Sequence, residues 1–287
     1  MLESAETWLR YAEEDLKAAE LLFKSGFHRH ALFWVEQASE KILKVFIVDV
    51  LRAKDLAPKF ADVISYYMMY AVSDEDRKEL ERLYKEVTRL SDPKSYQHIC
   101  KEKHIERVML FFDMLSKAPM LPPMKEILRG LSDIPKKISK ERYRRAFREA
   151  EKLVGEAVSS VQVPPIPSCR EFNASCIVQI LHSIEEREDR VREVILNAAR
   201  KELERHKGDE LAEEAVKDVC YLYTSFSDSL AVAPYLTLHT YLCQFFEATR
   251  YPEGEIPRDV VESLPQIICL LRKNLERVMR LVQSSNY

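Results

Sequence analysis

Apolar residues recur every three or four positions at both ends of this chain, and that spacing constrains its fold more than any other feature. The N-terminal series is Leu9, Ala12, Leu16, Ala19 and Phe23, and the C-terminal series is Leu264, Ile268, Leu271, Leu275, Val278 and Val282. An α-helix completes a turn in about 3.6 residues, so each series falls on one face of a helix. We therefore predict amphipathic helices over residues 3–25 and 258–284.

Glycine is scarce, and its scarcity argues against several other fold classes. Only 5 of the 287 residues are glycine. Tight β-hairpins and glycine-rich phosphate loops both need positive φ angles, which glycine supplies most readily. No segment of useful length alternates apolar and polar residues as a strand does. Apolar residues make up 46% of the chain, enough to bury a core, so the predicted fold class is all-α.

Prolines divide the chain into two predicted bundles. Pro119, Pro122 and Pro123 fall within a short segment in which no helix can continue. We predict an antiparallel bundle of four to five helices over 1–118, a proline-rich linker over 119–138, and a second such bundle over 139–287. The helices expected between the two ends cover 28–53, 59–72, 74–90, 95–117, a segment from 139, 170–206, 209–230 and 234–250. The helix that begins at 139 is expected to bury Ala146, Ala150, Leu153 and Ala157.

One short pattern occurs in both halves. Residues 87–93 (VTRLSDP) and 248–253 (ATRYPE) each combine Thr-Arg with an apolar residue, a proline and an acid before the last helix of their half. The pattern predicts an internal duplication whose two bundles are related by a pseudo-two-fold axis. Arg89 and Arg250 would then line one groove, where two guanidinium groups could hold a phosphate and Tyr251 could stack on a base. The simpler alternative is that each arginine stabilises the C-terminal end of its helix.

The first helical hairpin resembles a known family. Residues 8–19 (WLRYAEEDLKAA) and 30–44 (HALFWVEQASEKILK) are similar to the first two helices of HEPN domains, and 249–253 (TRYPE) is similar to the turn before their last helix. The resemblance covers 1–118 as a whole, and in the second half it covers about 235–285. It implies a small all-α bundle that binds nucleotide or RNA, in some members together with a nucleotidyltransferase partner. Other members are metal-independent ribonucleases with an Arg-x(4–6)-His motif.

The ribonuclease motif has few candidates here. Arg200 and His206 have the required spacing, but they fall in a helix well before the Arg250 turn, and a solvated helix face explains them as well. Arg89 and His98 are separated by eight residues, which exceeds the motif. An imidazole beside an arginine could activate a ribose hydroxyl and stabilise the phosphorane charge. The catalytic residues are therefore left open among Arg89, His98, Arg200 and His206.

Charge indicates where a partner could bind. The net charge is −3, which argues against general coating of nucleic acid, but Arg142, Arg144, Arg145 and Arg148 form one basic patch. The alternative for this patch is a charged helix start. The outer side of the second helix is expected to carry a solvated network of Lys41 and Lys44 with Glu36, Gln37 and Glu40, and a binding site is the alternative for these residues.

The remaining features concern compartment and cofactors. None of the six cysteines forms a C-x-x-C pair, so neither a zinc site nor another cofactor is expected. Buried reduced thiols are the simplest interpretation, and an intracellular disulfide would be less surprising if the protein comes from a thermophile. No membrane-spanning run and no secretory signal is present, which favours a cytoplasmic protein. Scarce Asn with abundant Glu, Lys and Arg is typical of a thermophile, and the resemblance adds an archaeal source.

The predicted function is binding of nucleotide or RNA, with a possible nucleotidyltransferase partner in a toxin–antitoxin or defence system. The partner and the system are implied by the resemblance alone. Two alternatives stay open, a metal-independent endoribonuclease and a helical scaffold that binds only protein. The chain is expected to be either a monomer with an internal pseudo-dimer or a homodimer.

Overall fold

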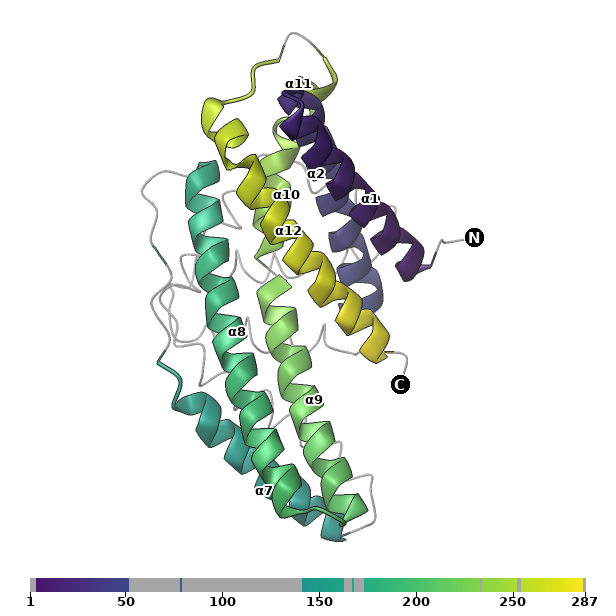
Figure 1. Cartoon of the computed structure of the whole chain (residues 1–287), viewed down its shortest axis with the longest axis vertical. Coiled ribbons are helices and arrows are strands. Elements are labelled where there is room, and N and C mark those ends of the chain that lie inside the picture. The colour runs from purple at the N-terminus through teal and green to yellow at the C-terminus, as the bar shows by residue number, and fades with distance from the viewer. Residues whose placement is uncertain are drawn as a thin grey trace. The chain divides into compact units, whose positions relative to one another are not determined.

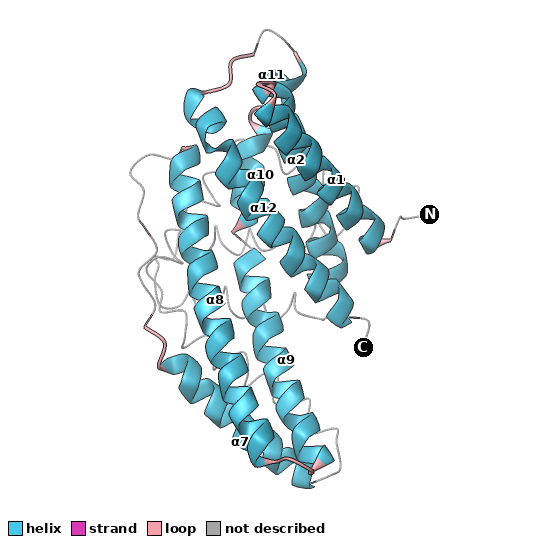
Figure 2. Ribbon diagram, viewed as in Figure 1, coloured by secondary structure: helices cyan, strands magenta, loops and turns pink. Residues whose placement is uncertain are grey.

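The computed structural model describes residues 4–51, 78, 141–162, 167, 173–232, 234–251 and 254–285. The elements in these ranges are α1 (Ala5–Lys24), α2 (His28–Val45), a π-helical turn (Phe46–Leu51), α7 (Glu141–Ser159), α8 (Ala174–Arg205), α9 (Glu210–Val232), α10 (Tyr235–Cys243), α11 (Phe246–Arg250) and α12 (Arg258–Ser285). The described residues contain helices and no strand, which confirms the all-α prediction for this part of the chain (Figure 2). None of the described helices combines the length and apolarity that crossing a membrane requires.

The N-terminal hairpin forms where the periodicity predicts it. The Ser4 hydroxyl accepts a hydrogen bond from the amide of Thr7 and caps the start of α1. Gly26 has φ +82°, a conformation that glycine adopts without strain, and it ends the helix. Of the predicted inner residues of α1, Leu9, Ala12, Leu16 and Ala19 are buried and Phe23 is partly buried, while α2 buries Ile42 among others. The two helices pack against each other, so the predicted hairpin is confirmed.

Helix α12 joins this hairpin. Its predicted apolar series from Leu264 to Val282 is buried, and the helix packs against both α1 and α2 (Figure 1). One hydrophobic core unites α1, α2 and α12 with α10 and the first residues of α8. The N-terminal hairpin therefore completes its core with helices from the far end of the chain.

The contacts divide the chain into two compact units. The first contains residues 1–117, 166–183 and 232–287, and the second contains 118–165 and 184–231. These units differ from the sequential halves that the prolines indicate, because the last helices of the chain belong with the first. The predicted linker over 119–138 lies outside the described residues. The pseudo-two-fold relation between two bundles stays a prediction.

In the second unit, polar and apolar contacts tie α7 to α9. The hydroxyl of Tyr143 donates to the carboxylate of Asp218, and the hydroxyl of Tyr223 reaches the carbonyl oxygen of Glu151 at 3.5 Å. The buried residues of α7 are Tyr143, Ala146, Phe147, Ala150, Val154 and Val158. Leu153, which was predicted to face inward, is 37% exposed. The buried face is centred on Phe147 and Val154, so the prediction placed it about one residue away.

Candidate functional site

The turn that follows α11 is held in place by the start of α2. The guanidinium of Arg29 donates one hydrogen bond to the carbonyl oxygen of Tyr251 and a second, of 2.7 Å, to that of Gly254. A Cβ atom on Gly254 would lie 2.4 Å from the Cα atom of Ala248, closer than any side chain could tolerate. Two carbonyl bonds and one close backbone contact thus fix how this turn leaves the helix.

Arg250 ends α11 and is exposed, as expected for a residue that meets a ligand. Its guanidinium carbon lies 3.7 Å from the ring centre of Phe246 and 5.7 Å from that of Phe33. A cation over an aromatic face is attracted by the ring and loses side-chain freedom. Tyr251 follows with 63% of its surface exposed. The stacked guanidinium and the open ring therefore lie next to each other along the chain.

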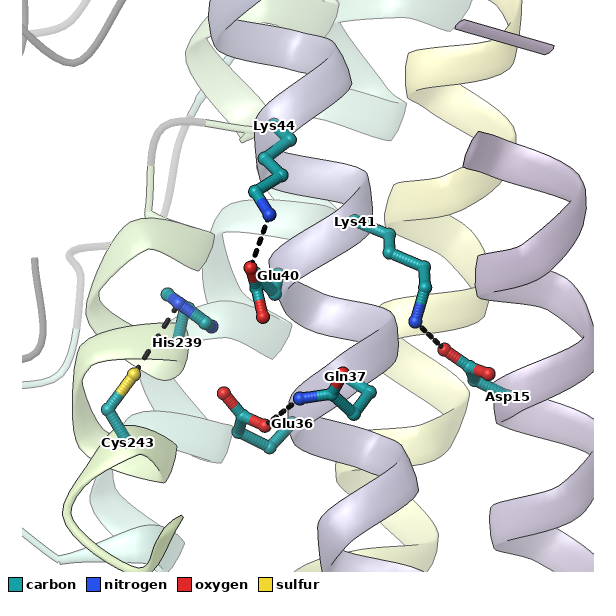
Figure 3. Close-up of polar contacts among 8 residues, drawn as sticks. All are labelled: Asp15, Glu36, Gln37, Glu40, Lys41, Lys44, His239 and Cys243. Atoms are coloured by element: carbon teal, nitrogen blue, oxygen red, sulfur yellow. Dashed lines mark hydrogen bonds and ion pairs between the residues drawn. The ribbon is translucent and has the colours of Figure 1, made fainter. Parts of the chain in front are cut away.

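One face of α2 is turned toward α10 and α11. Arg29 bonds to the turn after α11, and Phe33 lies beneath the guanidinium of Arg250. The carboxylate of Glu36 is attracted by the positive charge of Arg250. Further along α2, both Glu40 and Lys44 interact electrostatically with His239 of α10. These five positions are separated by four, three, four and four residues, which places them on one side of a helix. Figure 3 shows Glu36, Glu40 and Lys44 on the side of α2 that faces His239 and Cys243.

Glu36 is the unusual member of this face. It is 3% exposed, and the side-chain amide of Gln37 donates to its carboxylate at 2.7 Å. Burial raises the pKa of Glu36 from 4.5 to about 7, and the negative charge of Glu40 acts in the same direction. The Gln37 hydrogen bond and the charges of Arg250 and Lys41 lower the pKa and limit the shift. A carboxyl group that titrates near neutrality therefore lies within the electrostatic reach of Arg250.

Two side chains of α10 lie close to Glu36. The Nε2 atom of His239 is 3.5 Å from the Sγ atom of Cys243, and donor atoms of these residues and of Glu36 all lie within 4.8 Å of one another. All three residues are buried. Burial lowers the pKa of His239 to about 4, so its imidazole is neutral at physiological pH. Glu36 therefore faces a neutral imidazole and a sulfur atom inside the first unit.

The cysteines depart from the expected reduced state. Cys176 and Cys243 are each disulfide-bonded, whereas Cys220 and Cys269 are free. The prediction of reduced thiols is therefore wrong for Cys176 and Cys243. Sequence spacing did not reveal this, because disulfide pairing depends on which helices come together in the fold.

The expected solvated network on α2 is only partly present. Lys44 pairs with Glu40 at 2.5 Å, as the four-residue spacing predicts. Lys41 instead reaches across to Asp15 of α1 at 2.5 Å, where both side chains are largely buried (Figure 3). Glu36 is buried rather than exposed. Helices pack on both sides of α2, which leaves this helix no fully solvated side.

Comparison with known proteins identifies the family. A model of the HEPN domain matches residues 5–162, more than half of the 287 residues. The chain belongs to the HEPN family. No curated protein and no solved structure matches it. The HEPN match begins with α1 and ends just after α7, so it continues across the predicted linker over 119–138. A second HEPN copy over 139–287 is not confirmed by the family match.

The predicted Arg-x(4–6)-His pair, Arg200 and His206, lies at and just beyond the C-terminal end of α8, and its catalytic role stays a prediction. Arg200 is exposed and reaches Asn197 at 3.4 Å, whereas the imidazole of His206 bonds to Glu202 at 3.0 Å. Positions six apart fall on different faces of a helix. Arg89 and His98 lie outside the described residues, so the groove expected between Arg89 and Arg250 stays a prediction.

The predicted basic patch lies on α7. Arg142, Arg145 and Arg148 are exposed at three-residue spacing, while Arg144 is half-buried. Arg142 pairs with Asp209 at 2.6 Å, which offsets part of its charge. The patch is part of the second unit and the Arg250 turn is part of the first. We therefore treat the patch and the turn as separate candidates for binding.

Local sequence patterns gave no sign of Arg29, the residue of α2 that the fold brings to the Arg250 turn, because its hydrogen-bond partners lie at the other end of the chain. Phe27 and His30 flank Arg29 at the start of α2. Phe27 is 57% exposed and stacks edge-on with His30 at 6.2 Å. We call the group of Phe27, Arg29, His30, Arg250 and Tyr251 the α2–α11 corner.

Proposed function

We propose that this HEPN protein binds a nucleotide or single-stranded RNA at the α2–α11 corner. Membership of the HEPN family associates the chain with nucleotide- and RNA-related function in general. The observation that carries the specific proposal is the exposed Arg250–Tyr251 pair, whose turn is fixed by the two hydrogen bonds from Arg29.

The corner offers two kinds of group to a phosphate. The first is the guanidinium of Arg250, which is already ordered by stacking on Phe246 and so loses little freedom on binding. The second is the N-terminus of α2, where Phe27 occupies the capping position and no side chain caps the first amides. Free amide groups at a helix N-terminus attract anions. Both groups favour a negatively charged ligand over a neutral one.

The corner also offers surfaces on which a base can stack. Tyr251 and Phe27 are among the large apolar side chains that stay exposed in the described part of the chain. Stacking of one base on an aromatic ring is worth about 1–3 kcal/mol and depends little on sequence. The proposal therefore predicts weak sequence preference and a clear dependence on salt concentration.

Fluorescence anisotropy with a labelled single-stranded RNA tests the proposal, and competition with ATP separates mononucleotide from RNA binding. Arg250→Ala should weaken binding at least about tenfold and lower the salt dependence by about one phosphate contact. Tyr251→Ala should weaken binding by a factor of about five or more with the salt dependence unchanged. Arg190→Ala is the matched control, because Arg190 is an exposed α8 arginine that pairs with Glu186.

Equal affinity of Arg250→Ala and wild-type protein would overturn the proposed site. Loss of binding in an Arg145→Ala, Arg148→Ala double variant alone would place the contact on α7 instead. Cleavage of the RNA in the presence of a chelator, abolished by Arg250→Ala, would favour the endoribonuclease alternative. No binding and no cleavage would favour a protein-binding scaffold.

A nucleotidyltransferase partner remains part of the proposal only through the family resemblance. Co-expression with a candidate nucleotidyltransferase, followed by size-exclusion chromatography of the mixture, tests it directly. A stable complex would support the toxin–antitoxin or defence role, and separate elution of the two proteins would argue against it.

A further inference from the structure

The buried residues Glu36, His239 and Cys243 present three different donor types to one point. Glu36 is supplied by α2, while His239 and Cys243 lie one turn apart on α10. In Figure 3 the imidazole and the sulfur atom lie beside each other, and the Glu36 carboxylate extends toward them from the facing helix. Carboxylate oxygen, imidazole nitrogen and thiolate sulfur are the three ligand types that zinc accepts in proteins.

The spacing of the donors fits tetrahedral coordination. Zn–S and Zn–N bonds of about 2.3 Å and 2.0–2.1 Å, held at a tetrahedral angle, place sulfur and nitrogen about 3.6 Å apart. The observed distance between the Sγ atom of Cys243 and the Nε2 atom of His239 is 3.5 Å. The Glu36 oxygen lies within 4.8 Å of both atoms, so a small rotation of one flexible side chain completes the set.

The burial of the site also suits a cation. Glu36 is 3% exposed, and a divalent cation beside its carboxylate would offset the cost of burying that group. The sulfur of Cys243 is the exception, since a disulfide sulfur does not serve as a thiolate ligand.

We propose that Glu36, His239 and Cys243 bind one Zn²⁺ ion when Cys243 is reduced, and that the disulfide keeps the site closed. Reduction by a dithiol, or by a phosphine together with water, supplies two electrons and two protons and converts the disulfide into two thiols. Zinc then displaces the proton of the Cys243 thiol and forms the sulfur–metal bond, while water occupies the fourth position. The site thus couples metal binding to the redox state of the chain.

A second cluster of possible ligands provides a contrast. Glu149, Glu202 and His206 also bring their donor atoms within 4.8 Å, but they contain no sulfur and Glu149 is exposed. Glu202 there already bonds His206 at 3.0 Å and pairs with Arg205 at 3.6 Å. Contacts at the C-terminal end of α8 thus account for Glu202 and His206 without a metal, while Glu149 of α7 is exposed. The zinc proposal does not depend on nucleotide binding, because it concerns different atoms and a different ligand.

Cobalt titration of the full chain tests the proposal, since Co²⁺ reports its ligands by colour. In protein reduced with a phosphine, we expect one Co²⁺ per chain, visible bands of tetrahedral geometry, a thiolate-to-cobalt charge-transfer band, and loss of all these bands on addition of Zn²⁺. In oxidised protein the charge-transfer band should be absent. Cys243→Ser should abolish that band, and His239→Gln and Glu36→Gln should each weaken binding at least about tenfold.

The control is a Cys220→Ser, Cys269→Ser double variant, which removes the free thiols found among the described residues and should bind Co²⁺ as wild type does. Circular dichroism confirms that each variant is folded, and the comparison of reduced with oxidised wild type needs no variant at all. Absence of the charge-transfer band in reduced wild type would overturn the proposal. So would a band that survives Cys243→Ser, or cobalt binding without any sulfur band, which would place the metal away from Cys243.

Discussion

The two faces of α2 differ in what they bury. The face that meets α1 and α12 carries Ala31, Val35, Ala38 and Ile42, all of them fully buried and apolar. The face that meets α10 and α11 carries Arg29, Glu36, Glu40 and Lys44, with a buried carboxyl among them. Burial on the first face stabilises the fold, whereas burial on the second opposes ionisation. The two faces of α2 therefore carry different residues, with the apolar core residues on one and the charged and ionisable residues on the other.

The largest effect is expected on the apolar face. Ile42→Ala removes a side chain with no exposed surface and leaves a cavity between helices. We expect the free energy of unfolding to fall by about 2–5 kcal/mol, as measured by urea denaturation. RNA affinity of the folded variant should stay unchanged, because Ile42 does not face the α2–α11 corner. A similar loss of affinity would mean that the two faces are coupled.

The second largest effect is expected in the pH dependence of the free energy of unfolding, to which only the face toward α10 and α11 contributes a buried carboxyl. Glu36 binds its proton more tightly in the folded chain, so its contribution to the free energy of unfolding falls as pH rises from 4.5 to about 7. A shift of this size corresponds to about 3 kcal/mol. His239 has the opposite sign, because its pKa is lowered to about 4, and its contribution rises with pH up to 6.5. In the wild-type protein, the contributions of Glu36 and His239 to the free energy of unfolding therefore change with pH in opposite directions.

Glu36→Gln should expose this balance in metal-free protein kept with a chelator. The variant lacks the Glu36 contribution that decreases with pH. Its free energy of unfolding relative to wild type should therefore increase as pH rises from 4.5 to 7. His239→Gln is the matched counterpart and should show the reverse trend. Thermal or urea unfolding at a series of pH values measures both. Parallel curves for Glu36→Gln and wild type would contradict the raised pKa of Glu36.

The smallest effect on stability is expected at the α11 turn, although its effect on binding should be large. Gly254→Ala would place a Cβ atom 2.6 Å from the Cβ atom of Ala248, so the turn must shift. We expect a loss of about 1–3 kcal/mol in the free energy of unfolding. RNA affinity should fall at least about tenfold, because Arg29 would lose its carbonyl partners. Gly155→Ala in α7 is the control and should leave RNA affinity unchanged.

Local sequence patterns predicted the positions of helices more accurately than they predicted which residues pack against each helix. The α12 series is buried as predicted, because a long regular stripe tolerates only one inward face. The α7 prediction was off by about one residue, since its alanines mark the stripe less sharply than Phe147 and Val154 do. The α2 network was predicted to be solvated, although α1 and α10 cover parts of it. Periodicity shows that a residue lies on a face, but not what covers that face.

The candidate site shows the same limit. Arg250 and Tyr251 were found from a short motif, and both are exposed in the structure. Arg29, which holds their turn, lies at the other end of the chain and gives no local signal. The proposed zinc ligands gave no local signal either, since Glu36 lies on α2 whereas His239 and Cys243 lie on α10.

The sequence by itself indicated most helices of the described residues, because hydrogen bonds within a helix link residues four apart and the apolar spacing of each segment sets its buried side. The segment predicted as one helix over 234–250 is divided into α10 and α11. Only the tertiary structure decided that the last helix completes the core of the first hairpin, and that a carboxyl, an imidazole and a sulfur atom share one buried point. Such pairings depend on shape and charge complementarity between segments far apart in the chain, which no local pattern records.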